Sequence, residues 1–245
     1  EIELEPGVDE HADAVHLHAR DNLRAFIEDG ILVPDGEPHL YLYAQTMGEH
    51  RQVGVVACAS VADYQSGVIK KHENTRADKE DDRSRHIETL AAHDEPVFLT
   101  YRKRPAIDAL VDRATRAPAI YDFSSSDGVR HELWVLSRGE TMELAEAMAA
   151  VDALYVADGH HRSAAACRVH ERLRGDGGEH DAFVVVVFPH DQLQILAYNR
   201  VVRDPQRRSA DAIVRALGEV VALEDTRAAA PSGPKRLGVY VGGRW

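Results

Sequence analysis

The 245-residue chain has few cysteines and no long apolar segment, and each shortage excludes a class of protein. Its two cysteines, Cys58 and Cys167, fit neither a disulfide framework nor a Cys-x-x-Cys metal site, which favours a reducing compartment. No apolar run approaches the length of a membrane span, and no signal peptide opens the chain. We therefore expect a cytoplasmic protein without a membrane partner.

The common catalytic motifs are also missing. The chain has no Gly-x-x-x-x-Gly-Lys-Ser/Thr loop and no Gly-x-Gly-x-x-Gly, which excludes the usual nucleotide-binding folds. It has no Gly-x-Ser-x-Gly elbow, no His-Glu-x-x-His and no spaced Cys/His set, which excludes the common hydrolase and zinc classes.

The balance of charge is acidic. Against 41 acidic residues stand 29 basic ones, a net charge of −12, which argues against a general nucleic-acid binder. Apolar residues at 44% and charged residues at 29% are typical of a globular domain with a substantial core. Any anion site must therefore be a local basic cluster in an acidic molecule.

Such a cluster lies between residues 154 and 174. Four apolar residues predict a short buried strand, Asp158-Gly159 a tight turn, and the Ala-rich run after it a helix that Gly175 ends. The start of a helix has free N–H groups beside the positive end of its dipole, so this corner favours an anion such as phosphate. The alternative is a tight turn with a solvated polar cap.

A second cluster follows a predicted strand that ends near Ile69. Lysine, histidine and arginine side chains surround Glu73, so this strand end could present cations to a phosphate and a carboxylate as base. A helix is predicted from Asp78 onward. For residues 78–88 the alternative is a solvated helix with i, i+4 pairs such as Asp81 with Arg85.

The remaining pattern predicts a mixed α+β fold. A helix over residues 9–29 with Asp9 as N-cap, a hairpin of strands 40–47 and 52–61, and a fully buried strand over 182–188 are expected. A helix over 209–217, a strand over 220–223 and a hairpin over 237–245 should follow. We divide a single domain into residues 1–62, a core of 63–202 and an αβ extension of 203–245.

Five motifs resemble known families. The pentad Asp158-Gly-His-His-Arg162 resembles the phosphate-binding corner of the ParB/sulfiredoxin-like superfamily and, within it, of the free-serine kinases. Together with segments 67–73, 79–83, 96–102 and 188–192, it makes the chain similar to the domain-of-unknown-function family 1015. Since members of that family extend beyond both ends of this chain, the resemblance implies a fragment with a ParB/sulfiredoxin-like core.

The resemblance and the two clusters together imply phosphoryl transfer. We expect transfer from a nucleotide or pyrophosphate donor, with Mg²⁺, to a small hydroxyl compound. Asp158 and His161 match residues implicated in catalysis in the serine kinases; Glu73 is the candidate base and Asp158 the candidate metal ligand. The expected donor-binding residues are Lys70, Lys71, His72, Arg76, Gly159, His160, His161 and Arg162.

Two alternatives belong to other branches of that superfamily. One is a non-catalytic nucleotide-binding regulatory module of the ParB type, although the acidic charge and the lack of a helix-turn-helix signal argue against a role on DNA. The other is sulfiredoxin-like repair, which needs a cysteine in the turn where this chain has Asp158-Gly159-His160. Neither the donor and acceptor nor the oligomeric state follows from the sequence.

Overall fold

The computed structural model describes residues 8–9, 11–173, 178–196, 199–224, 231, 233 and 236–245 of the chain. It contains two compact units, Glu1–Leu193 and Gln194–Trp245, which are described separately here. The first unit holds the sheet and the clusters that the sequence pointed to.

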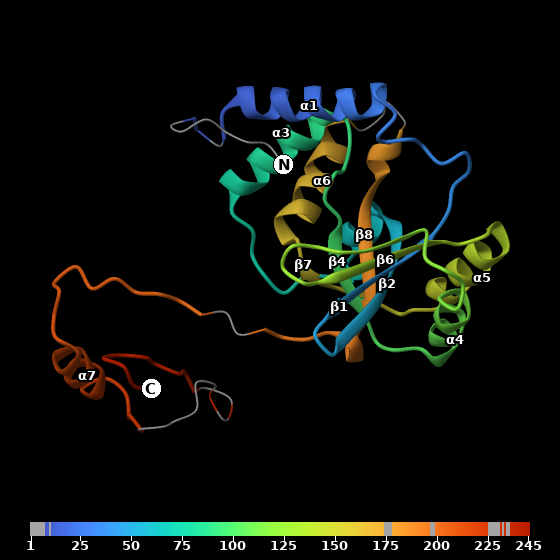
Figure 1. Ribbon diagram of the computed structural model, residues 1–245. Coiled ribbons are helices and arrows are strands. Elements are labelled where there is room, and N and C mark those ends of the chain that lie inside the picture. The colour runs from blue at the N-terminus through green and yellow to red at the C-terminus, as the bar shows by residue number, and fades with distance from the viewer. Residues whose placement is uncertain are drawn as a thin grey trace. The chain divides into compact units, whose positions relative to one another are not determined.

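The first unit is built around a sheet of eight strands in the order β3-β7-β4-β8-β2-β1-β6-β5 (Figure 1). The strands are β1 (Tyr41–Met47), β2 (His50–Ser60), β3 (Ile69–Lys70), β4 (Val97–Tyr101), β5 (Tyr121–Ser124), β6 (Arg130–Val135), β7 (Leu154–Asp158) and β8 (Ala182–Pro189). β3 pairs in parallel with β7 and β4 with β8, and the other neighbours are antiparallel. The predicted mixed α+β fold is therefore confirmed.

Helices pack on one another beside the sheet. They are α1 (Asp13–Glu28), α2 (Val61–Ser66), α3 (Ala77–Leu90), α4 (Pro105–Ala114), α5 (Arg138–Ala149) and α6 (His160–Arg172), with short 3₁₀ turns η1 (Glu179–Asp181) and η2 (His190–Gln192). α1 packs on α3, α3 on α6 and α4 on α5 (Figure 1). Among the described residues, no helix combines the length and apolar character that crossing a membrane requires.

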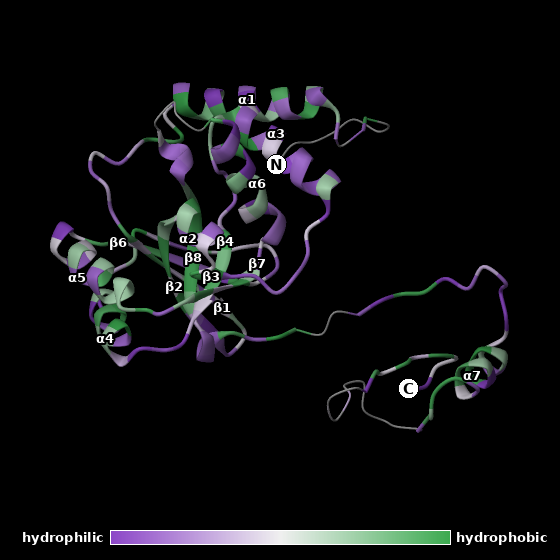
Figure 2. Cartoon of the chain, turned by 180° about the vertical axis from the view of Figure 1, so that it is seen from behind, coloured by the Kyte–Doolittle hydropathy of each residue, from purple (hydrophilic) through white to green (hydrophobic). Residues whose placement is uncertain are grey.

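The core lies along one row of the sheet. Register partners on six adjacent strands, each at most 4% exposed, share one face: Trp134, Leu42, Val55, Val187, Leu99 and Val156. Ile107 of α4, Leu144 of α5 and Ala166 of α6 join the same cluster, so helices cover this face. Figure 2 shows the green, apolar strands at the centre.

The opposite face of the sheet is tightly packed where β2 meets β8. A Cβ added to Gly54 would lie 2.7 Å from Val186 Cγ1 and 2.9 Å from two ring atoms of Phe188. We expect Gly54→Ala to lower the free energy of unfolding by about 1–3 kcal/mol, because an overfilled core displaces its neighbours. Chemical denaturation measures this, with Gly36→Ala as the control, since no atom lies within 4 Å of a Cβ added there. Equal stability of the two variants would contradict the packing.

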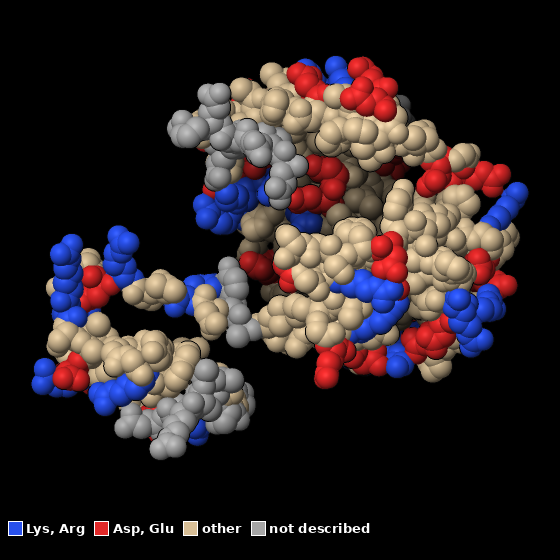
Figure 3. Space-filling view, viewed as in Figure 1, with Lys and Arg blue, Asp and Glu red and all other residues tan. Residues whose placement is uncertain are grey.

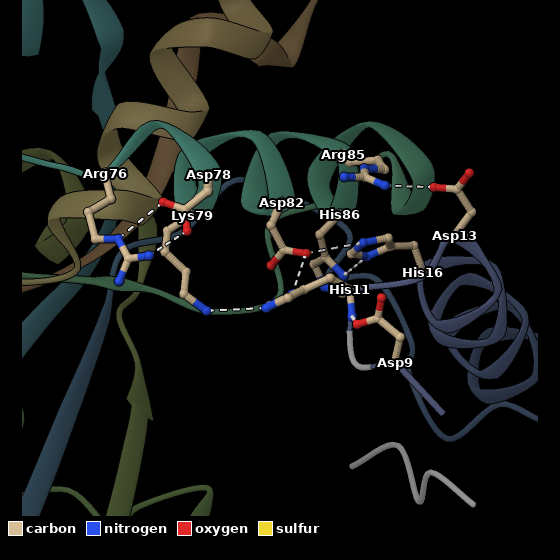
Figure 4. A network of polar contacts seen from close by, with 10 residues as sticks. All are labelled: Asp9, His11, Asp13, His16, Arg76, Asp78, Lys79, Asp82, Arg85 and His86. Carbon is tan, nitrogen blue, oxygen red and sulfur yellow. Dashed lines mark hydrogen bonds and ion pairs between the residues drawn. The ribbon is translucent and has the colours of Figure 1, made fainter. Parts of the chain in front are cut away.

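Charged side chains hold α3 to both of its neighbouring helices, and Figure 4 shows the pair with α1. Arg85 Nη1 donates to Asp13 Oδ1 of α1 at 2.8 Å, and Arg168 of α6 lies 2.6 Å from Glu80 Oε2 of α3 through its Nε. Arg168 also donates to Asp81. The pair of Asp81 with Arg85, which belonged to the alternative of a solvated helix, is replaced by pairs with other helices: Arg85 contacts Asp13 and Asp81 contacts Arg168.

A buried histidine lies between α1 and α3. His16 is 4% exposed, with its Nδ1 3.4 Å from His86 Nδ1 and its Nε2 3.5 Å from Asp82 Oδ1 (Figure 4). Burial lowers the pKa of His16 below its ordinary 6.5 and outweighs Asp82, which raises it; His86, Arg85 and Asp13 contribute less. Folding therefore favours the neutral form of this imidazole.

The free energy of unfolding should decrease as the pH falls below about 6.5. The unfolded chain then binds a proton that folded His16 resists, and His93 and His160, whose pKa values burial also lowers, add to the effect. Between the folded and the unfolded pKa of each histidine, its proton lowers the free energy of unfolding by at most about 1.4 kcal/mol per pH unit. His16→Gln should flatten the curve of melting temperature against pH between about 6.5 and 5. An unchanged curve would show that His16 titrates as it does in the unfolded chain.

Several predicted boundaries and elements differ from those of the structure. α1 begins at Asp13 after Ala12, so the prediction that Asp9 is its N-cap is wrong. The six-residue helix α2, capped by Ser60, was not predicted. In the described part of the second unit, α7 (Ala210–Gly218) confirms the predicted helix, residues 220–223 form no strand, and an isolated bridge between Val241 and Arg244 stands where a hairpin was expected.

Candidate functional site

The predicted strand–glycine–helix corner is present. β7 ends at Asp158, Gly159 has a φ of 91°, and α6 begins at His160. A φ in the left-handed region favours glycine, and a Cβ there would lie 3.4 Å from both the Arg162 guanidinium and Val97 Cα. The turn therefore depends on this glycine.

In the part of the chain that the structure describes, no side chain caps the start of α6. Its first backbone hydrogen bond runs from Ser163 N to Gly159 O at 3.0 Å. The N–H groups of His160, His161 and Arg162 precede that bond, at the positive end of the helix dipole. The geometry thus retains the anion-binding potential that the sequence indicated.

The short strand β3 brings the second cluster to this corner. Ile69 pairs with Leu154 and Lys70 with Tyr155, so the chain leaving β3 runs beside the end of β7. Glu73 Oε2 then lies 3.7 Å from His160 Nδ1. Two segments separated by more than eighty residues form one site through this parallel pairing.

A backbone hydrogen bond also joins the two segments. The N–H of Arg76 donates to His161 Nε2 at 3.2 Å. Because Nε2 accepts this bond, the proton of a neutral His161 ring must reside on Nδ1. His161 therefore presents a donor from its other nitrogen.

His160 is the buried member of the site. It is 5% exposed, and its ring meets the ring of His72 edge-on at a centroid distance of 4.4 Å. Burial and, next, His72 lower the pKa of His160, against the smaller opposing effects of Glu73 and Asp158. The neutral form of His160 is therefore favoured, beside the exposed Glu73 side chain.

Arg162 links the start of α6 to the start of β4. Its Nη2 donates to Asp158 Oδ2 at 3.0 Å, its Nε lies 3.5 Å from Glu95 Oε2, and its Nη1 donates to Pro96 O. Arg162 and His93 both line one pocket. Glu95 was not among the predicted site residues, because nothing local in the sequence marks it as a partner of Arg162.

The other predicted cations make contacts within their own segment. Lys70 Nζ donates to Gly67 O at 3.2 Å, and Lys71 Nζ lies 4.3 Å from the centroid of the Tyr64 ring. The Arg76 guanidinium pairs with Asp78, at 2.6 Å for Nη2. The structure thus brings Glu73, His72 and the backbone of Arg76 to the pentad, while these three cationic groups contact other residues.

One set of three side chains and one single carboxylate here could hold a metal ion. His72, Glu73 and His160 offer ligand atoms that all lie within 4.8 Å of one another. The Asp158 side chain is 72% exposed, and its Oδ2 lies 3.0 Å from Arg162 Nη2. Mg²⁺ prefers oxygen ligands and keeps several waters, and a single carboxylate beside donor phosphates suits it. Asp158 therefore fits the predicted magnesium ligand better than the histidine-rich set.

Acidic and basic side chains are interspersed on the visible face of the first unit (Figure 3). Among the residues drawn there, no broad basic surface covers that face. On this face, an anion would therefore have to be attracted by a local group of donors and not by a broad basic surface.

A family model described as "Protein of unknown function (DUF1015)" matches residues 1–245. No curated protein and no solved structure gives a significant match. The match covers the whole chain, and its description assigns no activity to the corner.

Proposed function

The chain belongs to the family described as Protein of unknown function (DUF1015), and because that description names no activity, we propose a function from the geometry of the site. The proposal is a phosphotransferase that moves a phosphoryl group from a nucleotide or pyrophosphate to the hydroxyl group of a small molecule. One observation carries it: Glu73 lies beside the uncapped start of α6, so a carboxylate and phosphate-binding N–H groups share one corner.

The start of α6 would hold the phosphates of the donor. Three backbone N–H groups and the Nδ1–H of His161 supply donors, and Arg162 adds positive charge. Mg²⁺ on Asp158 would neutralise charge on the same phosphates. Lys70, Lys71 and Arg76 could turn from their present contacts toward a bound polyphosphate, since all three are exposed.

Glu73 would take the proton of the acceptor. A bond forms between the acceptor oxygen and the transferred phosphorus, the bond from phosphorus to the donor's bridging oxygen breaks, and the acceptor proton passes to the Glu73 carboxylate. His160, buried and neutral, contacts this carboxylate without neutralising it. His160 is thus a positioning residue, because it acts through Glu73.

The proposal extends to the ancestry and location of the protein. The strand–glycine–helix corner with histidine and arginine supports a ParB/sulfiredoxin-like core. Cys58 and Cys167 are both free thiols, which supports a cytoplasmic location where nucleotide donors are present.

The test is turnover with defined donors. The chain is incubated with MgCl₂, pooled amino acids and polyols, and separately with ATP, ADP, CTP or pyrophosphate, and phosphorus NMR follows the products. We expect a new phosphomonoester signal with one of the donors. Tight binding in calorimetry without any product would instead favour the non-catalytic nucleotide-binding module, and absence of both binding and product would reject the proposed function.

A further inference from the structure

A second cluster of metal-binding side chains lies at the opposite end of α6. His170 is in the last turn of this helix, and His180 and Asp181 belong to η1, just before β8. The three residues offer ligand atoms that all lie within 4.8 Å of one another. We propose that His170, His180 and Asp181 bind a divalent ion of the Zn²⁺ class, independently of the proposed function.

The distances suit a single shared ion. Asp181 Oδ1 lies 2.9 Å from His170 Nδ1 and 3.8 Å from His180 Nε2. Ligand atoms bound tetrahedrally to Zn²⁺ at their usual bond lengths are separated by about 3.3 Å, and the two distances lie on either side of this value. A small adjustment of the side chains would complete the geometry.

The arrangement is not that of a simple hydrogen-bonded pair. His170 Nδ1 is buried and makes no hydrogen bond among the described residues, although Asp181 lies close to it. The side chains of both histidines are less than one-fifth exposed, at 18% and 14%, while Asp181 is 68% exposed. Two mostly enclosed imidazoles and an exposed carboxylate supply three ligands, and a zinc site with three protein ligands takes water as its fourth.

The surrounding charge favours a cation. The last turn of α6 carries the negative end of the helix dipole. Arg172, the other cationic residue of that turn, points away to Glu88 of α3 at 2.9 Å. Two imidazoles and one carboxylate select zinc or a neighbouring transition metal over Mg²⁺, which prefers oxygen ligands.

A bound ion would connect two parts of the fold. It would tie the end of α6 to the segment that leads into the buried strand β8. Since α6 begins at the candidate site, an ion bound at its C-terminal end would help to fix the position of the helix. The role is structural, so the readouts are metal affinity and melting temperature.

Calorimetry with ZnCl₂ on the complete chain tests the proposal, and the absorption of a Co²⁺-loaded sample reports the ligand geometry. We expect one Zn²⁺ per chain, a rise in melting temperature with Zn²⁺ and none with Mg²⁺. His180→Ala and His170→Ala should weaken zinc binding at least about 100-fold. Even substitution of a residue that only hydrogen-bonds to a metal ligand lowers metal affinity by about 10–100-fold. Asp181→Asn should weaken it less, since an amide oxygen remains a poor ligand.

Two control variants separate this cluster from other histidines. His72→Ala removes a member of the other histidine-rich set, and His18→Ala removes an exposed histidine of α1. Both should retain wild-type zinc affinity. The melting temperature of each variant without metal confirms that it is folded. The proposal is overturned if the chain does not bind Zn²⁺, or if binding is lost in His72→Ala and kept in His180→Ala.

Discussion

Glu73→Gln is expected to lower turnover by at least about 100-fold, the lower end of what a general base contributes. Glutamine preserves the shape of the side chain and can still contact His160, which lies 3.7 Å away through Nδ1. It cannot accept a proton from a hydroxyl acceptor. Donor affinity should therefore change little, because the phosphates are held by the start of α6.

The measurements are turnover by phosphorus NMR and donor affinity by calorimetry. Glu146→Gln is the matched control, since it neutralises an exposed carboxylate on α5. Asp158→Asn should behave differently and weaken Mg²⁺-dependent donor binding together with turnover. Near-normal turnover in Glu73→Gln would mean that this carboxylate only pairs with neighbouring groups at the surface.

Arg162→Ala is expected to weaken nucleotide or pyrophosphate affinity by at least about tenfold, because a charge-assisted hydrogen bond contributes about 1.5–3 kcal/mol. The structure adds a second expected effect. Since the guanidinium also contacts Pro96 O, Asp158 and Glu95, its loss should lower the melting temperature of the ligand-free chain.

Arg162→Lys separates the two effects. Lysine keeps the charge near the phosphates but cannot reproduce the planar fork that reaches three partners at once. It should therefore recover affinity more fully than stability. Arg116→Ala, which removes an exposed arginine beyond α4, is the control for general loss of charge. A fall in melting temperature without any loss of affinity would assign Arg162 a purely structural role.

The candidate corner could be predicted from sequence because its signals are local. An apolar run, a glycine that must adopt positive φ and an Ala-rich helix follow one another within about twenty residues, and each has a backbone cause. The buried strand β8 is equally local, since six of its eight residues are valine or phenylalanine in an unbroken run. Such features need no knowledge of the rest of the fold.

The partners of that corner could not be fully predicted, because they depend on register. Glu73 was selected for its chemistry, but its contact with His160 follows from which residues of β3 and β7 pair. Arg162 was predicted to face a phosphate, and its contacts with Glu95 and Pro96 arise from the antiparallel pairing of β4 with β7. Long-range pairing of this kind leaves no trace in a local pattern.

In the second unit, a strand predicted from apolar composition alone is wrong. Residues 220–223 were expected to form a strand, yet Val220 is 81% exposed and Val221 51% exposed. A strand needs a neighbour to satisfy its backbone groups. Within the described residues of that unit no neighbouring strand provides this, so the apolar run stays irregular.

The two-residue strand β3 has a consequence for how the corner opens. It lies at one end of the sheet order and, among the described strands, pairs only with β7, so few backbone hydrogen bonds resist its detachment. Local opening should therefore expose residues 69–76 to deuterium exchange well before the interior strands exchange. A ligand that bridges both segments can bind only the closed form, and would slow exchange in 69–76 selectively. The edge of the sheet would thus report occupancy of the corner without any labelled ligand.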